Sequence, residues 1–343
     1  MNSKKTTIHD IAEKLNITAS TVSRALNNNP RISEATKKAV LTMAKDLNYQ
    51  PNNLAAALRK GKSQLIGIIV PRINRSFFSA VVRGVEEVAN QLNYRVVVSQ
   101  SLETVENEIA VVNTLLNARV DGIIVSLVGE KSTDYEHYEN VTKKGVPLVL
   151  FDRTTTEIGT SQVIIDDYLG AYMATEHLIK QGCTKIAHFT HKKRFNIYNE
   201  RYRGYVEALK NHNIPFNESL VCEGNMQLED GRNCTKRLLD TDNDFDAIFS
   251  SSDYAIMGAM QVLKERNVKI PEEVALVGFS NEPFTSFTDP PLTSVNQFPI
   301  EMGQAAAELF FEMLNSTKKK LIPQKTVLQP ELIVRASSLK LEH

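Results

Sequence analysis

Short apolar runs alternate with helical patterns through most of the chain, and this alternation is the strongest constraint on its fold. The first run, Gln64-Leu-Ile-Gly-Ile-Ile-Val70, has the continuous apolar character of a strand buried on both faces of a parallel sheet. Further elements follow: a helix at 78–89, a strand at 94–99, a helix at 107–117, and strands at 121–126 and 146–151. This order predicts a doubly wound α/β unit.

A second series of the same kind starts near Gln162 with a strand that ends at Ile165. Later strands are expected at 185–190, 219–223, 246–250 and 274–279, and helices at 169–181, 200–211, 230–239 and 254–266. The two series predict two doubly wound lobes in tandem. Ligands of such sheets bind beyond the carboxyl ends of the strands, so we expect a binding cleft between the lobes.

The first fifty residues have a different pattern, that of three short helices. Thr7 with Asp10 is a plausible capping pair for the first helix, and Asn16 allows a left-handed turn after it. Thr18 can cap a second helix that runs to Leu26, with Val22, Ala25 and Leu26 on its apolar side. Its other side carries short hydroxyl side chains and one arginine, which fits a helix-turn-helix; a generic three-helix bundle is the alternative.

Charge is distributed unevenly along the chain, although the net charge is zero. Residues 1–62 contain eleven basic and four acidic side chains, a net charge of +7, and the remainder carries −7. A basic head on a larger acidic body favours a polyanion such as nucleic acid as partner of the head; a lysine-rich solvated surface is the alternative. At 343 residues, the chain is long enough for two to three domains of about 150 residues each.

Several classes of protein are disfavoured by composition. No apolar run reaches the roughly 18 residues of a membrane span, and the N-terminus lacks the apolar segment of a secretory signal. The three cysteines have no CxxC spacing, which argues against a disulfide framework and a zinc site and fits a reducing cytoplasm. Residues 341–343, Leu-Glu-His, look like the remnant of a cloning tag.

Catalytic motifs are also missing from the sequence. It contains no GxSxG, no GxxxxGK[ST] and no GxGxxG after a strand. His188 and His191 are expected on a strand and a loop, with no carboxylate at metal-ligand spacing. We therefore expect neither enzyme activity nor a bound cofactor or metal.

The head resembles the lactose/galactose repressor family along its whole length. The resemblance is carried by three segments: the run from Thr7 to Leu26 with its Thr-Val-Ser-Arg core, Arg31-Ile-Ser-Glu-Ala-Thr-Lys, and Leu47-Asn-Tyr-Gln-Pro-Asn52. It implies a helix-turn-helix DNA-binding domain at 1–50, a hinge helix or linker at 51–62, and a periplasmic-binding-protein-like effector core at 63–340. The first lobe of this core then covers about 63–164 and 295–326, and the second about 165–294 and 327–340.

The resemblance also implies which residues of the head and hinge meet DNA. Ala19, Ser20 and Arg24 occupy base-contacting positions of the recognition helix, and an arginine there can bind guanine bidentately. The remaining positions of the head are Thr7, Thr18, Thr21, Ser23 and Asn27, of which the hydroxyl residues suit phosphates. In the hinge, Leu58 matches a leucine that wedges between base pairs and Ala55 a small residue that faces the minor groove.

Side chains at the predicted strand ends form the expected effector site. They are Arg72, Asn74, Phe77, Phe78, Asp152, Arg153, His191, Arg201, Met226, Asp253, Ser280 and Asn281. By resemblance, Phe77 and Phe78 form an aromatic wall, whereas packing between elements is the alternative for these rings. Asp152, Arg201 and Asp253 match polar contacts of the family; a helix cap for Asp152 and a surface ion pair for Arg201 are the alternatives.

The end of the last strand departs from the family pattern. Gly278-Phe279-Ser280-Asn281 lacks the carboxylate that relatives often have there, so the ligand can be anionic or held elsewhere. Aromatic rings among polar groups suit a sugar or sugar derivative, and a purine would also stack. The sequence thus predicts a cytoplasmic, allosteric repressor that binds a palindromic operator in double-stranded DNA as a homodimer, with no membrane partner. A solute-binding or sugar-processing protein with an accessory head is the alternative.

Overall fold

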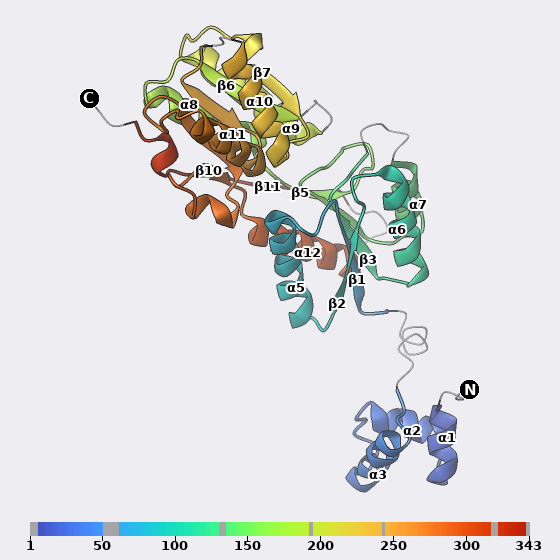
Figure 1. Ribbon diagram of the computed structural model, residues 1–343. Coiled ribbons are helices and arrows are strands. Elements are labelled where there is room, and N and C mark those ends of the chain that lie inside the picture. The colour runs from blue at the N-terminus through green and yellow to red at the C-terminus, as the bar shows by residue number, and fades with distance from the viewer. Residues whose placement is uncertain are drawn as a thin grey trace. The chain divides into compact units, whose positions relative to one another are not determined.

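The computed structural model describes residues 6–50, 62–129, 135–191, 195–241, 244–316 and 322–340. The chain divides into two compact units, Met1–Ser63 and Gln64–His343, called here the head and the core (Figure 1). The predicted hinge residues Ala55 and Leu58, and the Leu-Glu-His end at 341–343, lie outside the described residues.

The head contains the three helices that its sequence predicts: α1 (Ile8–Lys14), α2 (Ala19–Leu26) and α3 (Glu34–Asp46). Their ends are determined locally. The Thr18 hydroxyl accepts a hydrogen bond from the Thr21 N–H at 3.2 Å, and Ser33 caps α3 through Thr36 in the same way. Asn16 has φ of 50°, which confirms the left-handed turn between α1 and α2.

A small apolar cluster holds the three helices of the head together. Ile11 of α1, Val22 of α2 and Val40 of α3 are fully buried at its centre. Val22 and Ala25 of α2 are buried in this cluster, and Ala19 and Leu26 pack against it. The side chains of Ser20 and Arg24 remain exposed.

The first lobe of the core is built on a parallel sheet of strand order β11-β5-β4-β3-β1-β2. Its strands are β1 (Leu65–Val70), β2 (Arg95–Gln100), β3 (Gly122–Val125), β4 (Leu148–Phe151), β5 (Ser161–Ile165) and β11 (Lys325–Leu328). Its helices are α5 (Ser76–Gln91), α6 (Val105–Asn117), α7 (Glu136–Lys143) and α12 (Pro299–Asn315). Separate apolar clusters on the two faces of the sheet make this lobe a doubly wound unit.

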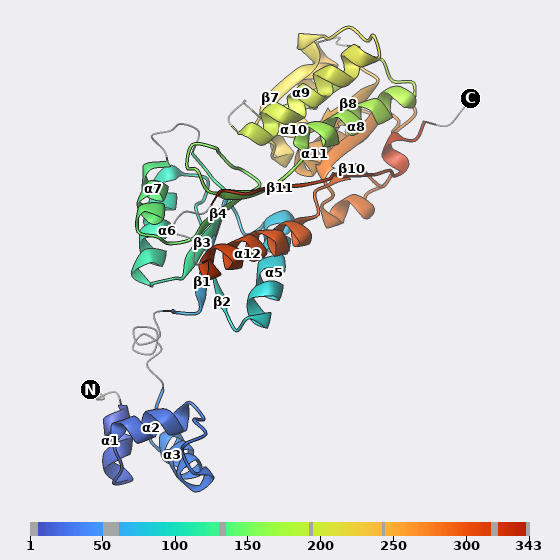
Figure 2. The same ribbon diagram turned by 180° about the vertical axis from the view of Figure 1, so that it is seen from behind.

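Helices α5 and α12 are far apart in sequence but lie side by side on one face of this sheet (Figure 2). Glycines allow the contact. A Cβ built on Gly84 of α5 would lie 2.1 Å from the Ile300 carbonyl oxygen, and one on Gly303 of α12 would lie 2.1 Å from that of Val81. A larger residue at either position would force the two backbones apart.

The second lobe has the sheet order β12-β10-β9-β8-β6-β7, in which only β12 is antiparallel to its neighbour. Its strands are β6 (Ile186–His191), β7 (Val221–Gly224), β8 (Ala247–Ser250), β9 (Ala275–Ser280), β10 (Thr293–Asn296) and β12 (Glu331–Ile333). Its helices are α8 (Asp167–Lys180), α9 (Asn196–Asn211), α10 (Leu228–Asp240) and α11 (Asp253–Glu265), with 3-10 turns at Glu218–Leu220, Pro283–Ser286 and Ala336–Ser338. The α8–α9 and α10–α11 pairs cover opposite faces of the sheet.

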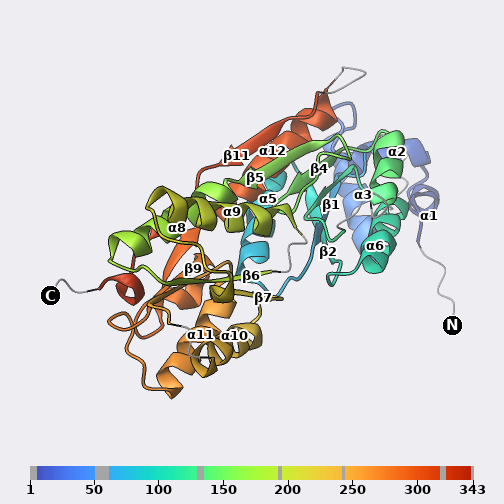
Figure 3. The same ribbon diagram turned by 90° about the horizontal axis from the view of Figure 1, so that it is seen from above.

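The chain passes between the lobes three times: after β5, after β10 and after β11 (Figure 3). The strand pattern alone placed the strand that ends at Ile165 at the start of the second series, and this was wrong, because β5 pairs with β4 and β11 in the first sheet. The first-lobe boundary near residue 164 that the resemblance implies agrees with this pairing. Strand β10 stays in the second sheet as far as Asn296, and β11 stays in the first as far as Leu328. Each of these last two crossings therefore lies about two residues beyond its expected position.

Cys222 of β7 and Cys234 of α10 form a disulfide, so the expectation from cysteine spacing was wrong. The two residues are 12 apart in sequence, and packing of α10 on β7 brings their Cα atoms to 5.9 Å. That distance follows from tertiary packing rather than from a local motif. Cys183 is free and buried, and burial raises the pKa of its thiol to about 11.

Reduction of this disulfide is expected to destabilise the core by up to about 3 kcal/mol, because the bond closes a loop that the reduced unfolded chain leaves open. Thermal unfolding with and without dithiothreitol measures the effect. The double variant Cys222→Ser/Cys234→Ser is the control, since its melting temperature should not respond to the reductant. An equal melting temperature for the reduced and oxidised natural sequence contradicts this prediction.

Among the described residues, no helix is both long and apolar enough to cross a membrane.

Candidate functional site

One face of α2 carries most of the residues expected to meet DNA. Ser20, Arg24 and the cap residues Thr18 and Asn27 are exposed, whereas Val22 and Ala25 face the interior of the head. The Thr18 hydroxyl lies 2.8 Å from the Ser20 hydroxyl and 2.9 Å from that of Thr21. These contacts order a row of hydroxyl groups at the helix N-terminus, where partial positive charge favours phosphate oxygens.

Arg24 projects from α2 without a hydrogen bond or ion pair to the part of the chain that the structure describes. An unpaired guanidinium on the exposed face of a slim helix is available for bidentate binding to a base edge. Asn27 is less free, since its side-chain amide donates to the Ser23 carbonyl oxygen at 2.7 Å. Thr7 is exposed at the start of α1, where its hydroxyl donates to Asp10 at 2.7 Å.

The core contains a cleft of about 600 Å³ that residues of both lobes line. Nine of the twelve residues expected at the effector site line this cleft: Arg72, Phe77, Phe78, Asp152, Arg153, His191, Arg201, Met226 and Ser280. They come from the carboxyl ends of β1, β4, β6 and β9 and from the segments that follow strands. The topology of the two parallel sheets therefore gathers them.

Asn74, Asp253 and Asn281 are absent from the cleft lining. Asn74 is exposed between β1 and α5. Asp253 is fully buried and accepts hydrogen bonds from the Glu282 N–H at 2.8 Å and the Ser294 hydroxyl at 2.7 Å. Burial raises the pKa of Asp253 to about 7. The side-chain oxygen of Asn281 accepts a hydrogen bond from Arg335 at 2.8 Å. Asp253 and Asn281 therefore support the backbone beneath the site.

Aromatic rings cover the inner part of the cleft. Phe77 and Phe78 meet edge to face with ring centres 5.1 Å apart, and both also belong to the apolar cluster of the first lobe. These two residues therefore both pack in the core of the first lobe and line the cleft. From the second lobe, Tyr198 stacks on His191 at 5.0 Å. Flat apolar faces on both sides suit a ring-shaped ligand.

Arg201 is buried in the second lobe, with only 3% of its surface exposed, and so it is not the surface ion pair considered from sequence. Its Nε lies 2.8 Å from Asp167, its Nη1 donates to the Ser251 carbonyl oxygen at 2.9 Å, and its guanidinium lies 3.7 Å from the centre of the Phe279 ring. Burial raises the pKa of Asp167 to about 7, against the opposing effect of Arg201. These contacts hold the guanidinium in one orientation at the cleft wall.

Asp152 follows β4 in a left-handed conformation with φ of 58°. It accepts a hydrogen bond from the Ser126 hydroxyl at 3.2 Å. Burial raises the pKa of Asp152, while Arg153 and Arg201 act in the opposite direction. A buried carboxylate that lines the cleft is a suitable acceptor for a ligand hydroxyl.

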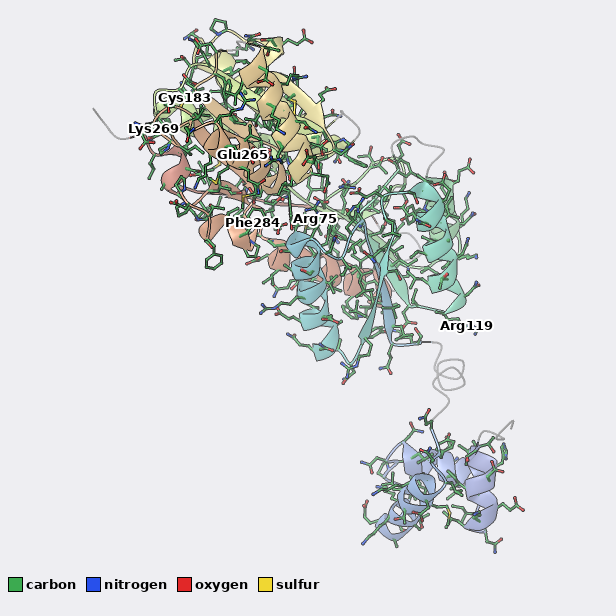
Figure 4. The ribbon with its side chains drawn as sticks, viewed as in Figure 1. Arg75, Arg119, Cys183, Glu265, Lys269 and Phe284 are labelled. Atoms are coloured by element: carbon green, nitrogen blue, oxygen red, sulfur yellow. A yellow bond between two sulfur atoms is a disulfide. The ribbon has the colours of Figure 1, made fainter. Side chains whose placement is uncertain are left out.

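Arg75 joins the two lobes of the core at the cleft. It precedes α5 of the first lobe, yet its guanidinium lies 3.6 Å from the centre of the Tyr254 ring and bonds to the Gln227 side chain, both in the second lobe. Tyr254 in turn meets Phe284 edge to face at 5.2 Å. Figure 4 shows Arg75 and Phe284 where the two lobes meet.

Sequence reasoning missed Arg75, Glu103, Phe195, Tyr198 and Tyr254, all of which line the cleft. One signal for Tyr198 was its position one turn before Arg201 on α9, which places both on one helix face. Tyr254 directly follows Asp253. No local pattern marks Glu103, which enters the cleft through the segment between β2 and α6.

Both parts of the chain match known protein families. Residues 7–52 match the family described as bacterial regulatory proteins, lacI family, and residues 175–338 match the periplasmic binding protein-like domain. The ribose operon repressor of Halalkalibacterium halodurans is 32% identical over 97% of both chains.

Solved structures agree with these matches. The transcriptional regulator CelR in complex with cellobiose is 28% identical, with a TM-score of 0.73 over 97% of this chain and 100% of that chain. The lac repressor dimer bound to operator and the anti-inducer ONPF is 25% identical, with a TM-score of 0.86 over 98% of this chain and 100% of the other. The chain belongs to the lacI family of bacterial regulatory proteins, with a DNA-binding helix-turn-helix head and a periplasmic-binding-protein-like core for a small effector.

Proposed function

We propose that the protein is a cytoplasmic repressor that binds a palindromic operator as a homodimer. Binding of a sugar or sugar derivative in the core cleft lowers or raises its affinity for the operator. The observation that carries the proposal is the combination of two sites on one chain. The head exposes Arg24 and a row of hydroxyl groups on α2, and the core holds a cleft between two lobes.

The cleft chemistry favours a sugar. Aromatic rings from both lobes can stack on the C–H face of a sugar ring, and Asp152 and Arg201 can bond to hydroxyl groups. The names of two relatives, a ribose operon repressor and a CelR–cellobiose complex, point the same way. A purine remains the second candidate, because the Phe77–Phe78 and Tyr198 rings would stack on it too.

DNA binding can be tested by its salt dependence. The labelled DNA that flanks the protein's own gene is titrated with the full chain at several salt concentrations, and fluorescence anisotropy reports the dissociation constant. Phosphate contacts by the basic head predict a steep loss of affinity, on the order of 10³-fold between 50 and 200 mM salt for about six contacts. Failure to bind at the lowest salt concentration would favour the alternative of a solute-binding protein with an accessory head.

Ligand binding can be tested by thermal unfolding against sugars, sugar phosphates, sugar acids and nucleobases. A ligand that binds only the folded cleft stabilises the core by mass action and so raises its melting temperature. At a ligand concentration one hundred times the dissociation constant, the free energy of unfolding rises by about 2.7 kcal/mol. Stabilisation by a nucleobase without stabilisation by any sugar derivative would replace the sugar with a purine in this proposal.

Arg75→Met is expected to weaken binding of the stabilising sugar by about 5- to 50-fold, because the cation–π contact with Tyr254 and the bond to Gln227 both join the lobes. Isothermal titration calorimetry measures the change. Arg83→Met is a matched control, since Arg83 is exposed on α5 and pairs only with Glu87 of the same helix among the described residues. Equal affinities for the two variants contradict a role of Arg75 in lobe closure.

A further inference from the structure

One wall of the cleft carries two arginines at the carboxyl edge of the first sheet. Arg72 follows β1, Arg153 follows β4, and Glu103 lies between β2 and α6. All three line the cleft. Because β1, β2, β3 and β4 are parallel neighbours, their carboxyl ends bring these three side chains together.

A single carboxylate serves both arginines at this wall. Glu103 lies 3.1 Å from Arg72 Nη2 and 3.5 Å from Arg153 Nη2. Burial opposes ionisation of Glu103, but the Arg153 and Arg72 guanidiniums outweigh it and lower the pKa of this carboxyl group. The two guanidiniums therefore share Glu103 as their ion-pair partner at this wall.

Arg153 also has hydrogen-bond donors to spare. It is only 8% exposed, yet its Nε and Nη1 find no acceptor in the part of the chain that the structure describes. Arg72 Nε is in the same condition. The Arg153 guanidinium lies 4.3 Å from the centre of the Phe195 ring, which limits its freedom to turn elsewhere. Buried guanidinium donors without a partner are costly, so a ligand acceptor in the cleft is the expected partner.

The surroundings favour an acceptor that carries charge. The first turn of α6 also lines the cleft, with Thr104, Val105 and Glu106; its free N–H groups add partial positive charge, which the Glu106 carboxylate opposes. Two carboxylates of the cleft are available as acceptors. Asp152 lies next to Arg153, and Glu282 is 4% exposed and has a buried Oε2 without a partner among the described residues. The cleft thus combines an anion-binding wall with acceptors for hydroxyl groups.

We propose that the effector is an anionic sugar, whose phosphate or carboxylate group is bound by Arg153 and Arg72 while Asp152 and Glu282 accept its hydroxyl groups. This inference rests on the proposed function of the cleft as the effector site. Phosphate and carboxylate share the chemistry that recognises them here, since a guanidinium can bind two oxygens of either group at once.

Matched ligands test the proposal. Thermal unfolding of the full chain is measured with glucose, glucuronate and glucose 6-phosphate, and with inorganic phosphate. The same comparison of a neutral sugar with its acid and its phosphate is made for galactose, mannose and fructose. We expect at least one anionic sugar to raise the melting temperature while its neutral counterpart at the same concentration does not. The member that acts, sugar acid or sugar phosphate, identifies the source of the anion. The proposal is overturned if only neutral sugars stabilise the protein, or if each neutral sugar stabilises it as much as its anionic counterpart. It is also overturned if no anionic sugar stabilises the protein.

Variants locate the anion within the cleft. Arg72→Gln is expected to fold, because the Arg72 side chain is 42% exposed, and to weaken binding of the anionic sugar by about tenfold or more. Arg153→Gln should have the larger effect. Arg119→Gln is the control, since Arg119 is exposed after α6 and lies at the end of this lobe away from Arg75 (Figure 4). Equal affinities for the anionic sugar in Arg72→Gln, Arg153→Gln and Arg119→Gln overturn the assignment.

The DNA titration separates this inference from the function on which it depends. If the protein binds DNA and responds to a neutral sugar, the repressor function stands and the anionic ligand is wrong. If it binds an anionic sugar in the cleft but binds no DNA at low salt, the anion site stands and the repressor function fails.

Discussion

Arg24→Ala should abolish selective binding to the operator while leaving the head folded. Arg24 is exposed on α2 and has no partner among the described residues, so its removal leaves no buried group unsatisfied. A bidentate contact to a base contributes about 1–3 kcal/mol of discrimination, and a dimer makes it twice, so the expected loss of affinity for the specific site is roughly 30-fold to 2 × 10⁴-fold.

The control for this variant is Lys45→Ala, which removes the same charge from the last turn of α3. A charge effect alone would lower affinity equally for specific and random DNA in both variants, because phosphate contacts carry no sequence information. Anisotropy titrations of both DNAs, with circular dichroism to verify folding, measure the difference. Arg24→Ala with an unchanged ratio of specific to random affinity contradicts the assigned role of α2.

Arg201→Ala is expected to destabilise the core and to remove its ligand response. The substitution leaves the Asp167 carboxylate buried without its 2.8 Å partner and also removes a hydrogen bond to Ser251. Loss of one member of a buried ion pair costs about 3–5 kcal/mol. For a core of this size that corresponds to a fall in melting temperature of roughly 10 °C.

Arg203→Ala is a matched control two residues further along α9. Its exposed guanidinium pairs with Glu200, and such surface pairs contribute only about 0–1 kcal/mol. The double variant Arg201→Met/Asp167→Asn should recover part of the stability, because no buried charge is left unpaired, but it should still fail to bind the effector. Equal melting temperatures for Arg201→Ala and Arg203→Ala contradict the structural part of this prediction.

Local signals in the sequence predicted the head well. The cap at Thr18 and the left-handed turn at Asn16 depend on residues within three or four positions of each other, so a single sequence contains the information. The resemblance of the same segment to a known family was also sufficient to predict the fold of the whole chain, which the family matches confirm.

Features that depend on contacts between distant segments were predicted less well. The strand that ends at Ile165 joins the first sheet because it pairs with β4 on one side and with β11, more than 150 residues later, on the other. No residue of the strand itself specifies that choice. The Cys222–Cys234 bond likewise follows from packing of α10 on β7. Cleft residues that directly follow strand ends, such as Arg72 and Asp152, were predicted from sequence. Arg75 and Glu103 were missed, because their place in the cleft depends on how distant elements pack together.

The most direct test of the account is the change in DNA affinity that a cleft ligand causes in the intact chain. Anisotropy titrations of the operator fragment are run with and without the sugar derivative that stabilises the core, at one salt concentration. Coupling between the two sites predicts a change in dissociation constant of about 5- to 150-fold, in either direction. An operator affinity that stays the same while the ligand saturates the cleft would contradict the claim that the core controls the head.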